Sequence, residues 1–392
     1  MIAVDIVIIV CMALLGYCFV VYPIVIRLLA ARFPEPMILD ESYQPTVSII
    51  LAVHNEERVL ERCLQSLLRL DYPKDNIELL IGSDGSIDRT NEIVRQFSAQ
   101  YPFIRPFFFT QQRGKMPVLN DLVTEATGAI LFFVDADILL SSNSIRVQVR
   151  HFIDPVIGAV AGAYEVHTAE MTTLYNSEKE YASIEHQVRL NESSYYSTLG
   201  LFGGNYTLRR ELWRLLPDGL VHDDLFVVFS TLHRGYRIIF EPEAISVDHY
   251  KRTYREEFRR KSRSASRGYH TLSFFPSLLF PRTRRTAFLL WSHKILRWLS
   301  PVFILTVVIA ILVGLLISGP GLFSVLLTGV GILAALSIAG FIAETVGFSI
   351  PLVRQLSWFV VMNIAYLHGS MVFLTSSDTE IWKPSTRAEL LT

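Results

Sequence analysis

The sequence has few cysteines and almost no net charge, and each shortage excludes a class of protein. Only Cys11, Cys18 and Cys63 occur in 392 residues, and their spacing builds neither a disulfide framework nor a zinc site. With so few cysteines, we expect the polar part of the chain to fold in a reducing compartment. The formal net charge of -1 gives no overall positive potential, so nothing indicates a nucleic acid as partner.

Long apolar runs, in contrast, are plentiful. The first, Ile6 to Ile26, contains 21 consecutive uncharged residues, enough for one helix across about 30 Å of hydrocarbon. A cleaved signal peptide is the alternative, but it would begin with basic residues, whereas Arg27 and Arg32 follow this run. We therefore predict an uncleaved transmembrane anchor in residues 1–32.

The C-terminal third is more apolar still. Between Arg297 and Glu344 lie 46 uncharged residues, interrupted once by Ser318-Gly-Pro-Gly321, which predicts a hairpin of two spans. A further 23 uncharged residues separate Arg354 from Asp378 and predict one more span. The predicted boundaries are 299–377 for about three transmembrane helices and 378–392 for a tail.

Basic residues border the polar middle of the chain on both sides. On the C-terminal side they are Arg282, Arg284, Arg285, Lys294 and Arg297. Because basic flanks stay on the cytoplasmic side, we expect a multi-pass protein of a bacterial inner or plasma membrane with this middle part in the cytoplasm. Three spans after the middle would put the tail outside, yet its Lys383 and Arg387 favour the inside, so an interfacial or re-entrant segment is the alternative.

Residues 273–298 mix aromatic side chains with arginines. This pattern is typical of an amphipathic helix that lies at the membrane surface. A plain extension of the following span is the alternative.

The polar middle alternates short apolar runs with segments of helical periodicity. The runs Val47–Val53, Ile77–Ile81 and Ile130–Val134 have the character of strands buried on both faces. Between the first two, leucines from Leu60 to Leu68 recur at helical spacing. The sequence therefore predicts an α/β domain with a mostly parallel sheet.

Polar clusters follow each of these three strands. They are His54-Asn-Glu56, Ser83-Asp-Gly-Ser86 and Asp135-Ala-Asp137. Ligands of such sheets bind beyond the carboxyl ends of the strands, so we expect a common site there.

Asp135 and Asp137 are candidate ligands of a divalent metal. Two carboxylates at the end of a buried strand are costly unless a cation satisfies them, and Mg²⁺ or Mn²⁺ that also bridges phosphates would do so. A solvated turn is the alternative. Asp84, in its glycine-containing turn, is a candidate contact of a base, or else a cap of the next helix.

Two further groups are candidates for the same chemistry. Lys115, just after Gly114, is a candidate phosphate contact, with a plain surface position as the alternative. The pair Asp223-Asp224 can supply a general base, although an acidic start of a helix explains it equally well.

The segment from Lys251 to Arg267 carries eight basic residues. It suits either anionic lipid at the membrane surface or a diphosphate, which arginines bind in a bidentate manner. For the second role we favour Arg259, Arg260 and Arg263.

Taken together, these residues resemble the membrane-bound family 2 glycosyltransferases, a group that includes cellulose, hyaluronan and poly-N-acetylglucosamine synthases. The resemblance covers about residues 45 to 270. The motifs that carry it, in order, are Val53-His-Asn-Glu56, Ser83-Asp-Gly-Ser86, Gly114-Lys115 with Leu119-Asn120, Asp135-Ala-Asp137, Gly203-Gly-Asn205 and Asp223-Asp224.

The resemblance implies a GT-A nucleotide-sugar domain, which we place at residues 40–272. His54, Glu56, Asp84, Lys115 and Asp135 would then bind the donor. The same resemblance implies Asp224 as the catalytic base, Asp223 as the residue that positions the acceptor or its loop, and Mg²⁺ or Mn²⁺ as cofactor.

One motif departs from the family. Processive members carry Gln-x-x-Arg-Trp after the base, whereas this chain has Phe258-Arg-Arg-Lys-Ser-Arg263 with no tryptophan. We therefore expect an inverting, non-processive transfer from a nucleotide sugar, such as a UDP-sugar, to a lipid-linked or glycan acceptor in cell-surface or exopolysaccharide biosynthesis. A processive synthase that moves its own polymer and a non-catalytic nucleotide-sugar-binding membrane protein are the alternatives.

Overall fold

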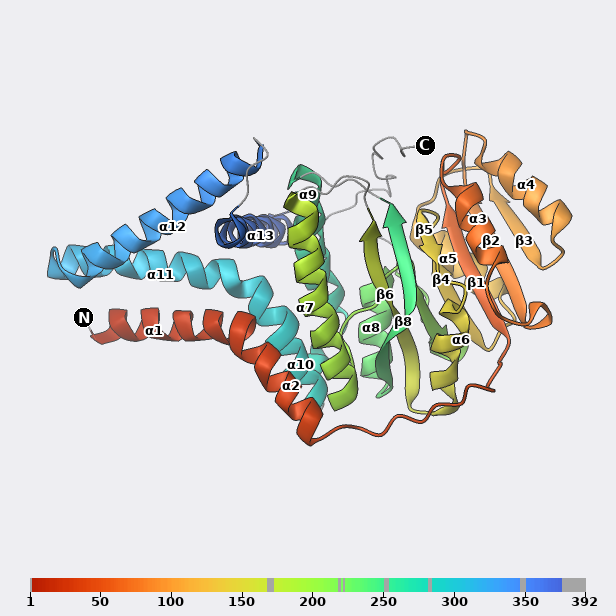
Figure 1. Ribbon diagram of the computed structural model, residues 1–392, viewed down its shortest axis with the longest axis horizontal. Helices are drawn as coiled ribbons and strands as arrows, with labels where there is room; N and C mark the ends of the chain where they lie inside the picture. The colour runs from red at the N-terminus through yellow and green to blue at the C-terminus, as the bar shows by residue number, and fades with distance from the viewer. Residues whose placement is uncertain are drawn as a thin grey trace.

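The computed structural model describes residues 2–167, 173–217, 220, 223–249, 254–280, 284–345 and 350–375. Figure 1 shows a sheet domain with its helices on one side of the molecule and a group of long apolar helices on the other. The predicted tail, Lys251 and Arg282 lie outside the described residues.

The sheet domain is built on eight strands in the order β3-β2-β1-β4-β7-β6-β8-β5. Strands β3, β2, β1 and β4 are mutually parallel, β7 is antiparallel to both of its neighbours, β6 and β8 are parallel, and β5 is antiparallel to β8. The strands are β1 (Val47–Val53), β2 (Ile77–Asp84), β3 (Ile104–Phe109), β4 (Ile130–Val134), β5 (Ile138–Leu140), β6 (Ile157–His167), β7 (Tyr206–Arg209) and β8 (Arg237–His249). The predicted mostly parallel α/β sheet is confirmed.

Helices cover both faces of the sheet because its central strands are apolar on both faces. All residues of β1 and β4 are buried. One face packs under α3 (Leu60–Leu68) and α4 (Thr90–Gln100), and the other under α5 (Lys115–Glu125) and α8 (Asp223–His233). A short helix, α6 (Ser144–Val149), follows β5. Burial of these alternating apolar faces is the main stabilising term for the domain.

Two apolar helices are each bent by one π-helical turn. The first comprises α1 (Ile2–Gly16), the turn η1 (Tyr17–Val21) and α2 (Tyr22–Arg32). The second comprises α10 (Arg284–Leu290), the turn η7 (Trp291–Ile295) and α11 (Leu296–Ser318). The turns lie against each other, since the hydroxyls of Tyr17 and Ser292 are 2.8 Å apart. Such π-helical turns change the direction of a helix.

After α11 the chain reverses at the predicted break and continues in α12 (Leu322–Thr345) and α13 (Pro351–Thr375). Four segments are long and apolar enough to cross a membrane: Ile2–Arg32, Arg284–Ser318, Leu322–Ala343 and Leu352–Thr375. The protein is therefore an integral membrane protein by the length and composition of its helices. Residues 284–318 form one bent helix, and this helix includes the second half of the predicted interfacial segment 273–298. The position of that segment at the membrane surface stays a prediction.

Two more helices join the halves of the molecule. They are α7 (Thr173–Tyr195), which packs beside α2, and α9 (Tyr254–Ser273), which packs beside α13. Figure 1 shows both between the sheet and the apolar helices.

A buried polar cluster fixes α7 to the apolar helices. The side chain of His293 bonds to Glu192 at 2.6 Å and to Glu185 at 3.0 Å, and Arg297 forms an ion pair with Glu185. The hydroxyl of Tyr22 donates to Glu192 at 2.5 Å. Burial opposes the charged form of Glu185, but Arg297 and His293 outweigh it and hold its pKa well below the usual range. The cluster thus links α7 to both bent apolar helices.

Candidate active site

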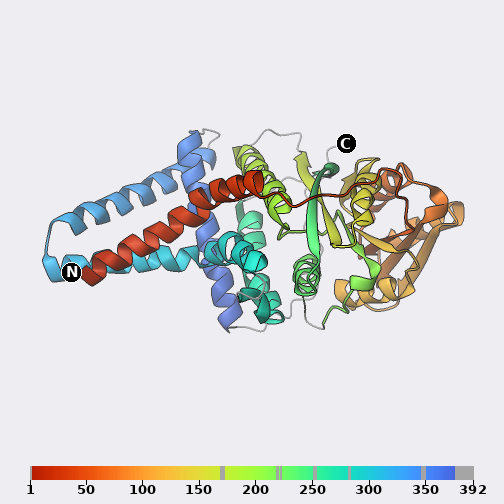
Figure 2. The same ribbon diagram turned by 90° about the horizontal axis from the view of Figure 1, so that it is seen from below.

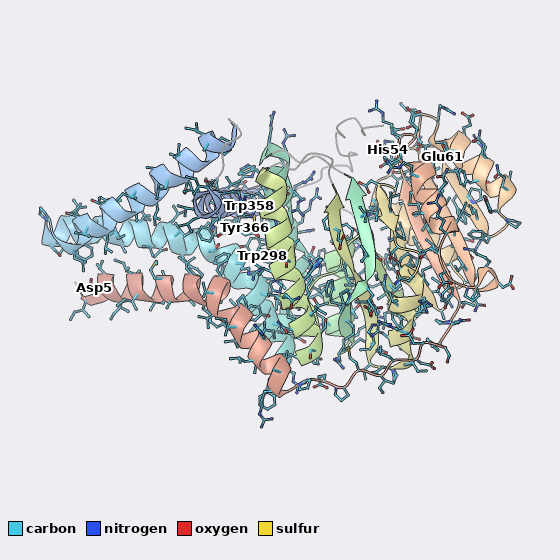
Figure 3. The ribbon with its side chains drawn as sticks, viewed as in Figure 1. Asp5, His54, Glu61, Trp298, Trp358 and Tyr366 are labelled. Atoms are coloured by element: carbon cyan, nitrogen blue, oxygen red, sulfur yellow. The ribbon has the colours of Figure 1, made fainter. Side chains whose placement is uncertain are left out.

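The loops after β1 and β2 are bonded into one unit at the carboxyl edge of the sheet. His54 is buried, and its Nδ1 lies 2.6 Å from the carbonyl oxygen of Asp84. The amide nitrogen of Glu56 donates to the Thr90 hydroxyl at 2.8 Å. Asn55, at φ 54°, has a left-handed backbone, which turns the chain sharply between its two neighbours. Figure 3 shows His54 at this edge.

Asp84 organises the loop that leads to α5. Its side chain is fully buried, and its two carboxylate oxygens accept the backbone amides of Arg113 at 2.9 Å and Gly114 at 2.7 Å. In this conformation the residue therefore holds the start of α5 in place. The predicted contact with a nucleotide base stays a prediction.

Lys115 is the centre of the charged site. Its ammonium lies 2.9 Å from Asp135 Oδ1 and 3.0 Å from Asp223 Oδ2, so the first residue of α5 joins the end of β4 to the start of α8. Burial lowers the pKa of this ammonium, but the two carboxylates raise it more, and the pKa lies above its usual value. The lysine is thus a permanent cation and not a surface residue.

Asp224 lies beside Gly203, as Asp135 does. A Cβ added to Gly203 would lie 3.8 Å from Asp224 Oδ2 and 3.5 Å from Asp135 Oδ2, and these are its nearest contacts within 4 Å. The Asp135 and Asp224 carboxylates therefore face the same space above a residue that has no side chain.

Asp137 lies on the same edge as Asp135 and Glu56. Burial, and then the charges of Asp137, Asp135 and Glu56, raise the pKa of the buried Cys63 thiol, which donates to the Asp135 carbonyl at 3.7 Å. No group of three or more His, Cys, Asp or Glu side chains among the described residues could hold a metal by itself. Two aspartates fit Mg²⁺ or Mn²⁺ nonetheless, since Mg²⁺ commonly takes one or two carboxylates and completes its shell with substrate phosphate and water.

Tyr206, the first residue of β7, lies beneath the site and had not been predicted as part of it. It is fully buried and stacked on Phe133, with 4.6 Å between ring centroids. Burial, and then the charges of Asp223, Asp224 and Asp135, raise its pKa, so its hydroxyl stays protonated. In the described part of the chain, that hydroxyl has no hydrogen-bond partner. Only its position next to Gly203-Gly-Asn205 hinted at a place in the site.

The three arginines predicted to bind a diphosphate lie on α9. Arg260 bonds to Glu257, one turn earlier on the same helix, at 2.7 and 2.5 Å. Arg259 and Arg263 are exposed. The structure thus brings together Lys115, Asp135, Asp223 and Asp224, and places the arginines on a separate element.

Comparisons with known proteins show what the chain is similar to. Residues 48–216 match the family model described as Glycosyl transferase family 2. The chain is 28% identical over 249 residues to the probable glycosyltransferase YdaM of Bacillus subtilis, an alignment that covers 62% of this chain and 59% of YdaM. It is 25% identical over 286 residues to the poly-beta-1,6-N-acetyl-D-glucosamine synthase of Staphylococcus epidermidis, covering 68% of each chain.

A solved structure resembles the whole fold. It is the mannosyltransferase PcManGT from Pyrobaculum calidifontis in complex with GDP-Man and Mn²⁺, with a TM-score of 0.70 and 22% sequence identity. The match covers 94% of this chain and 99% of that one. Both the sheet domain and the apolar helices are therefore shared with this structure.

The site at the carboxyl edge of the sheet thus lies in and just after a segment with a family-wide sequence pattern. The family model includes Asp84, Lys115 and Asp135, and Asp224 follows its end by eight residues. Residues 48–216 therefore carry the sequence pattern of Glycosyl transferase family 2, and the chain is similar to glycosyltransferases over a longer segment.

Proposed function

We propose that the chain transfers one sugar from a nucleotide-sugar donor to an acceptor hydroxyl with inversion at the anomeric carbon. One observation carries the proposal: Asp135 and Asp224, from separate elements, face the same space over Gly203. Inverting transfer needs a site for the donor diphosphate and, opposite it, a carboxylate for the acceptor proton. We assign Asp135 to the diphosphate end and Asp224 to the acceptor end.

The donor side would use the loops after β1, β2 and β4. We assign His54, Glu56 and Asp84 to the nucleotide pocket, where they would bind the nucleotide or hold the loops around it in place. Asp135 and Asp137 would hold Mg²⁺ or Mn²⁺, which when bound neutralises charge on the diphosphate leaving group. Lys115, close to Asp135, would add a fixed positive charge beside the phosphates.

The acceptor side would use the start of α8. Asp224 accepts the proton of the acceptor hydroxyl while that oxygen attacks the anomeric carbon. The bond from this carbon to the phosphate oxygen breaks, and the nucleoside diphosphate leaves with the electron pair. Asp223, paired with Lys115, keeps the start of α8 in register. Arg259, Arg260 and Arg263 on α9 would stabilise the departing charge or bind anionic lipid.

A UDP-sugar is the donor we propose, and a lipid-linked or glycan hydroxyl the acceptor. The GDP-mannose named for PcManGT makes a GDP-sugar the second candidate. The absence of Gln-x-x-Arg-Trp from the sequence favours single transfer over polymer synthesis. The relation to poly-beta-1,6-N-acetyl-D-glucosamine synthases supports the processive alternative.

The test is release of nucleoside diphosphate by the detergent-purified protein. Donors should include UDP- and GDP-sugars with Mn²⁺, and acceptors should include membrane lipid extracts. Short products confirm the proposed transferase, and long products favour a processive synthase. Thermal stabilisation by a nucleotide sugar without turnover on any acceptor would support a non-catalytic binding protein.

A further inference from the structure

Helix α13 is less apolar than the other candidate spans. Its mean hydropathy is the lowest among the four candidate spans in the described part of the chain. It carries the buried polar side chains of Arg354, Asn363 and Ser357. Polar groups are costly in hydrocarbon, so their position along the membrane normal needs an explanation.

The figures show that α13 runs crosswise to the other apolar helices. In Figure 1, α13 is seen end-on while α1, α11 and α12 extend sideways from the sheet domain. In Figure 2, turned by 90°, α13 runs vertically and the same three helices again extend sideways. If α1, α11 and α12 cross the bilayer, α13 lies parallel to its surface.

The contacts of α13 agree with this crosswise orientation, because they lie just beyond the end of α1, in the first turns of α11 and in the second half of α12. Asn363 accepts from Ser300, the fifth residue of α11, at 2.6 Å. The Ser357 hydroxyl donates to the carbonyl of Ser337, the sixteenth of the 24 residues of α12, at 2.8 Å. The ring of Phe359 meets Phe19 of η1 at 5.1 Å between centroids. A helix that spanned the bilayer beside α11 would contact it at successive depths instead.

On its other side α13 packs closely on α9. The hydroxyl of Ser262 lies 2.7 Å from His368 Nδ1, and a Cβ on Gly369 would lie 2.3 Å from the Ser262 carbonyl oxygen. Figure 3 shows Tyr366 and Trp358 of α13 near Trp298, where the helices meet the sheet domain, far from Asp5 in the outer part of α1.

Helix α9 is too charged to enter hydrocarbon. Its charged residues are Arg255, Glu256, Glu257, Arg259, Arg260, Lys261, Arg263 and Arg267. Ser262, the contact with α13, lies among them. If α13 crossed the bilayer, this contact would draw several charges of α9 towards the membrane centre, where charged side chains are costly.

We propose that α13 lies in the plane of the membrane surface on the side of the sheet domain. Its exposed apolar residues Leu352, Ile364, Met371 and Leu374 face the boundary between headgroups and acyl chains of one leaflet. The chain then crosses the membrane three times, through α1, α11 and α12. The end of α13 then lies on the same side as the sheet domain, and the basic Lys383 and Arg387 that follow in the sequence fit the bias of basic residues towards the cytoplasm.

The experiment is labelling of single cysteines with a membrane-impermeant maleimide in sealed vesicles of both orientations. Cys11, Cys18 and Cys63, all buried, are first replaced by alanine. Ser385→Cys reports the tail, Ser98→Cys on α4 reports the sheet domain, and Ser318→Cys at the turn after α11 reports the opposite side. We expect Ser385→Cys to be labelled together with Ser98→Cys. Labelling of Ser385→Cys together with Ser318→Cys would overturn the proposal.

A second measurement removes any dependence on the tail. A fluorophore on Leu352→Cys and on Leu374→Cys, at the two ends of α13, is quenched by lipids that carry quenchers at known depths. An in-plane helix gives the same shallow depth from one leaflet for both labels. Leu322→Cys and Ile342→Cys, at the ends of α12, provide the spanning control and should report opposite leaflets. Opposite leaflets for the two α13 labels would contradict the proposal.

Discussion

Asp223 and Asp224 are neighbours in sequence, yet their surroundings differ. Asp223 is 8% exposed and paired with Lys115. Asp224 accepts the amide of Leu225 at 2.6 Å, while its other oxygen faces the space over Gly203. A carboxylate held by a permanent cation is a poor proton acceptor, because the cation favours its charged form. The geometry therefore separates a positioning carboxylate from a candidate base.

The Lys115→Met substitution should reduce turnover by at least about tenfold, because it leaves the Asp135 and Asp223 carboxylates facing each other without their shared cation. Lys115→Arg, which keeps the charge, should retain more activity. Steady-state kinetics with each purified variant provide the measurement. Activity of Lys115→Met equal to the unmodified protein would exclude a role for this ammonium.

The ion pairs of Lys115 with Asp135 and Asp223 should stabilise the fold equally at all pH values near neutrality. The pKa of Lys115 is raised in the folded protein, so the pairs contribute fully below its unfolded value of about 10.4 and are lost only as pH rises through the folded pKa. We expect the melting-temperature difference between the unmodified protein and Lys115→Met to stay constant from about pH 6 to 9. A difference that disappears within this range would show that the ammonium loses its proton below its usual pKa, which contradicts the raised pKa.

Gly203→Ala tests the shared space directly. The added methyl meets only the two carboxylate oxygens, at ordinary contact distances of 3.5 and 3.8 Å, so the fold should accept it. It would nevertheless occupy the space proposed for the reacting groups. We expect kcat/KM to fall by about tenfold or more with no change in melting temperature. Unchanged kinetics would place the substrate elsewhere.

At the scale of elements, the sequence predicted one half of the sheet much better than the other. The apolar strands β1 and β4 have the predicted ends, and β2 differs only by its extension to Asp84. Strands β7 and β5 are four and three residues long, too short for a periodic signal. In β6 the run from Gly158 to Ala163 is rich in glycine and alanine, which have little preference for strands.

For the site, the strand ends and the order of the motifs were enough to predict Asp135 and Asp224 as site residues. The sequence could not predict which site side chains contact one another. The ion pair of Lys115 with Asp223 joins residues 108 positions apart, and no local pattern encodes it. The cluster around Glu185 and His293 was missed for the same reason. In α7 the helical periodicity is weak because charged residues face inward to partners on other helices.

The junction cluster should be essential for stability. Glu185→Gln keeps the shape of the side chain but removes the charge that compensates the buried Arg297. Because breaking a buried ion pair costs about 3–5 kcal/mol, we expect a clearly lower melting temperature in detergent. Exposed Glu61→Gln, on α3, is the matched control and should melt as the unmodified protein does. Equal melting of both variants would show that the cluster does not hold the two halves together.

Acid should have a related effect. The pKa of Glu185 is depressed in the folded protein, so its stabilisation is present above the unfolded value of about 4.3 and is lost as pH falls below it. Thermal melting between pH 3 and 6 should therefore show a steeper loss for the unmodified protein than for Glu185→Gln. Parallel curves would assign the acid sensitivity to other groups.

At the scale of the molecule, the basic flanks predict that the sheet domain faces the cytoplasm. Arg27 and Arg32 lie at one border, and Arg284 and Arg285 at the other. The Ser98→Cys variant of the cysteine-free protein should resist an impermeant maleimide in intact cells and react after permeabilisation. Rapid labelling in intact cells would reverse the orientation.

The most direct test of the proposed mechanism compares Asp224→Asn with Asp223→Asn by release of nucleoside diphosphate with Mn²⁺. Asparagine keeps shape and hydrogen bonding but cannot accept the acceptor proton. Asp224→Asn should therefore lower turnover by about 10²–10⁴, the usual contribution of a general base, while thermal stabilisation by the donor is retained. Asp223→Asn should cost less. Normal turnover by Asp224→Asn together with an inactive Asp223→Asn would contradict the assignment.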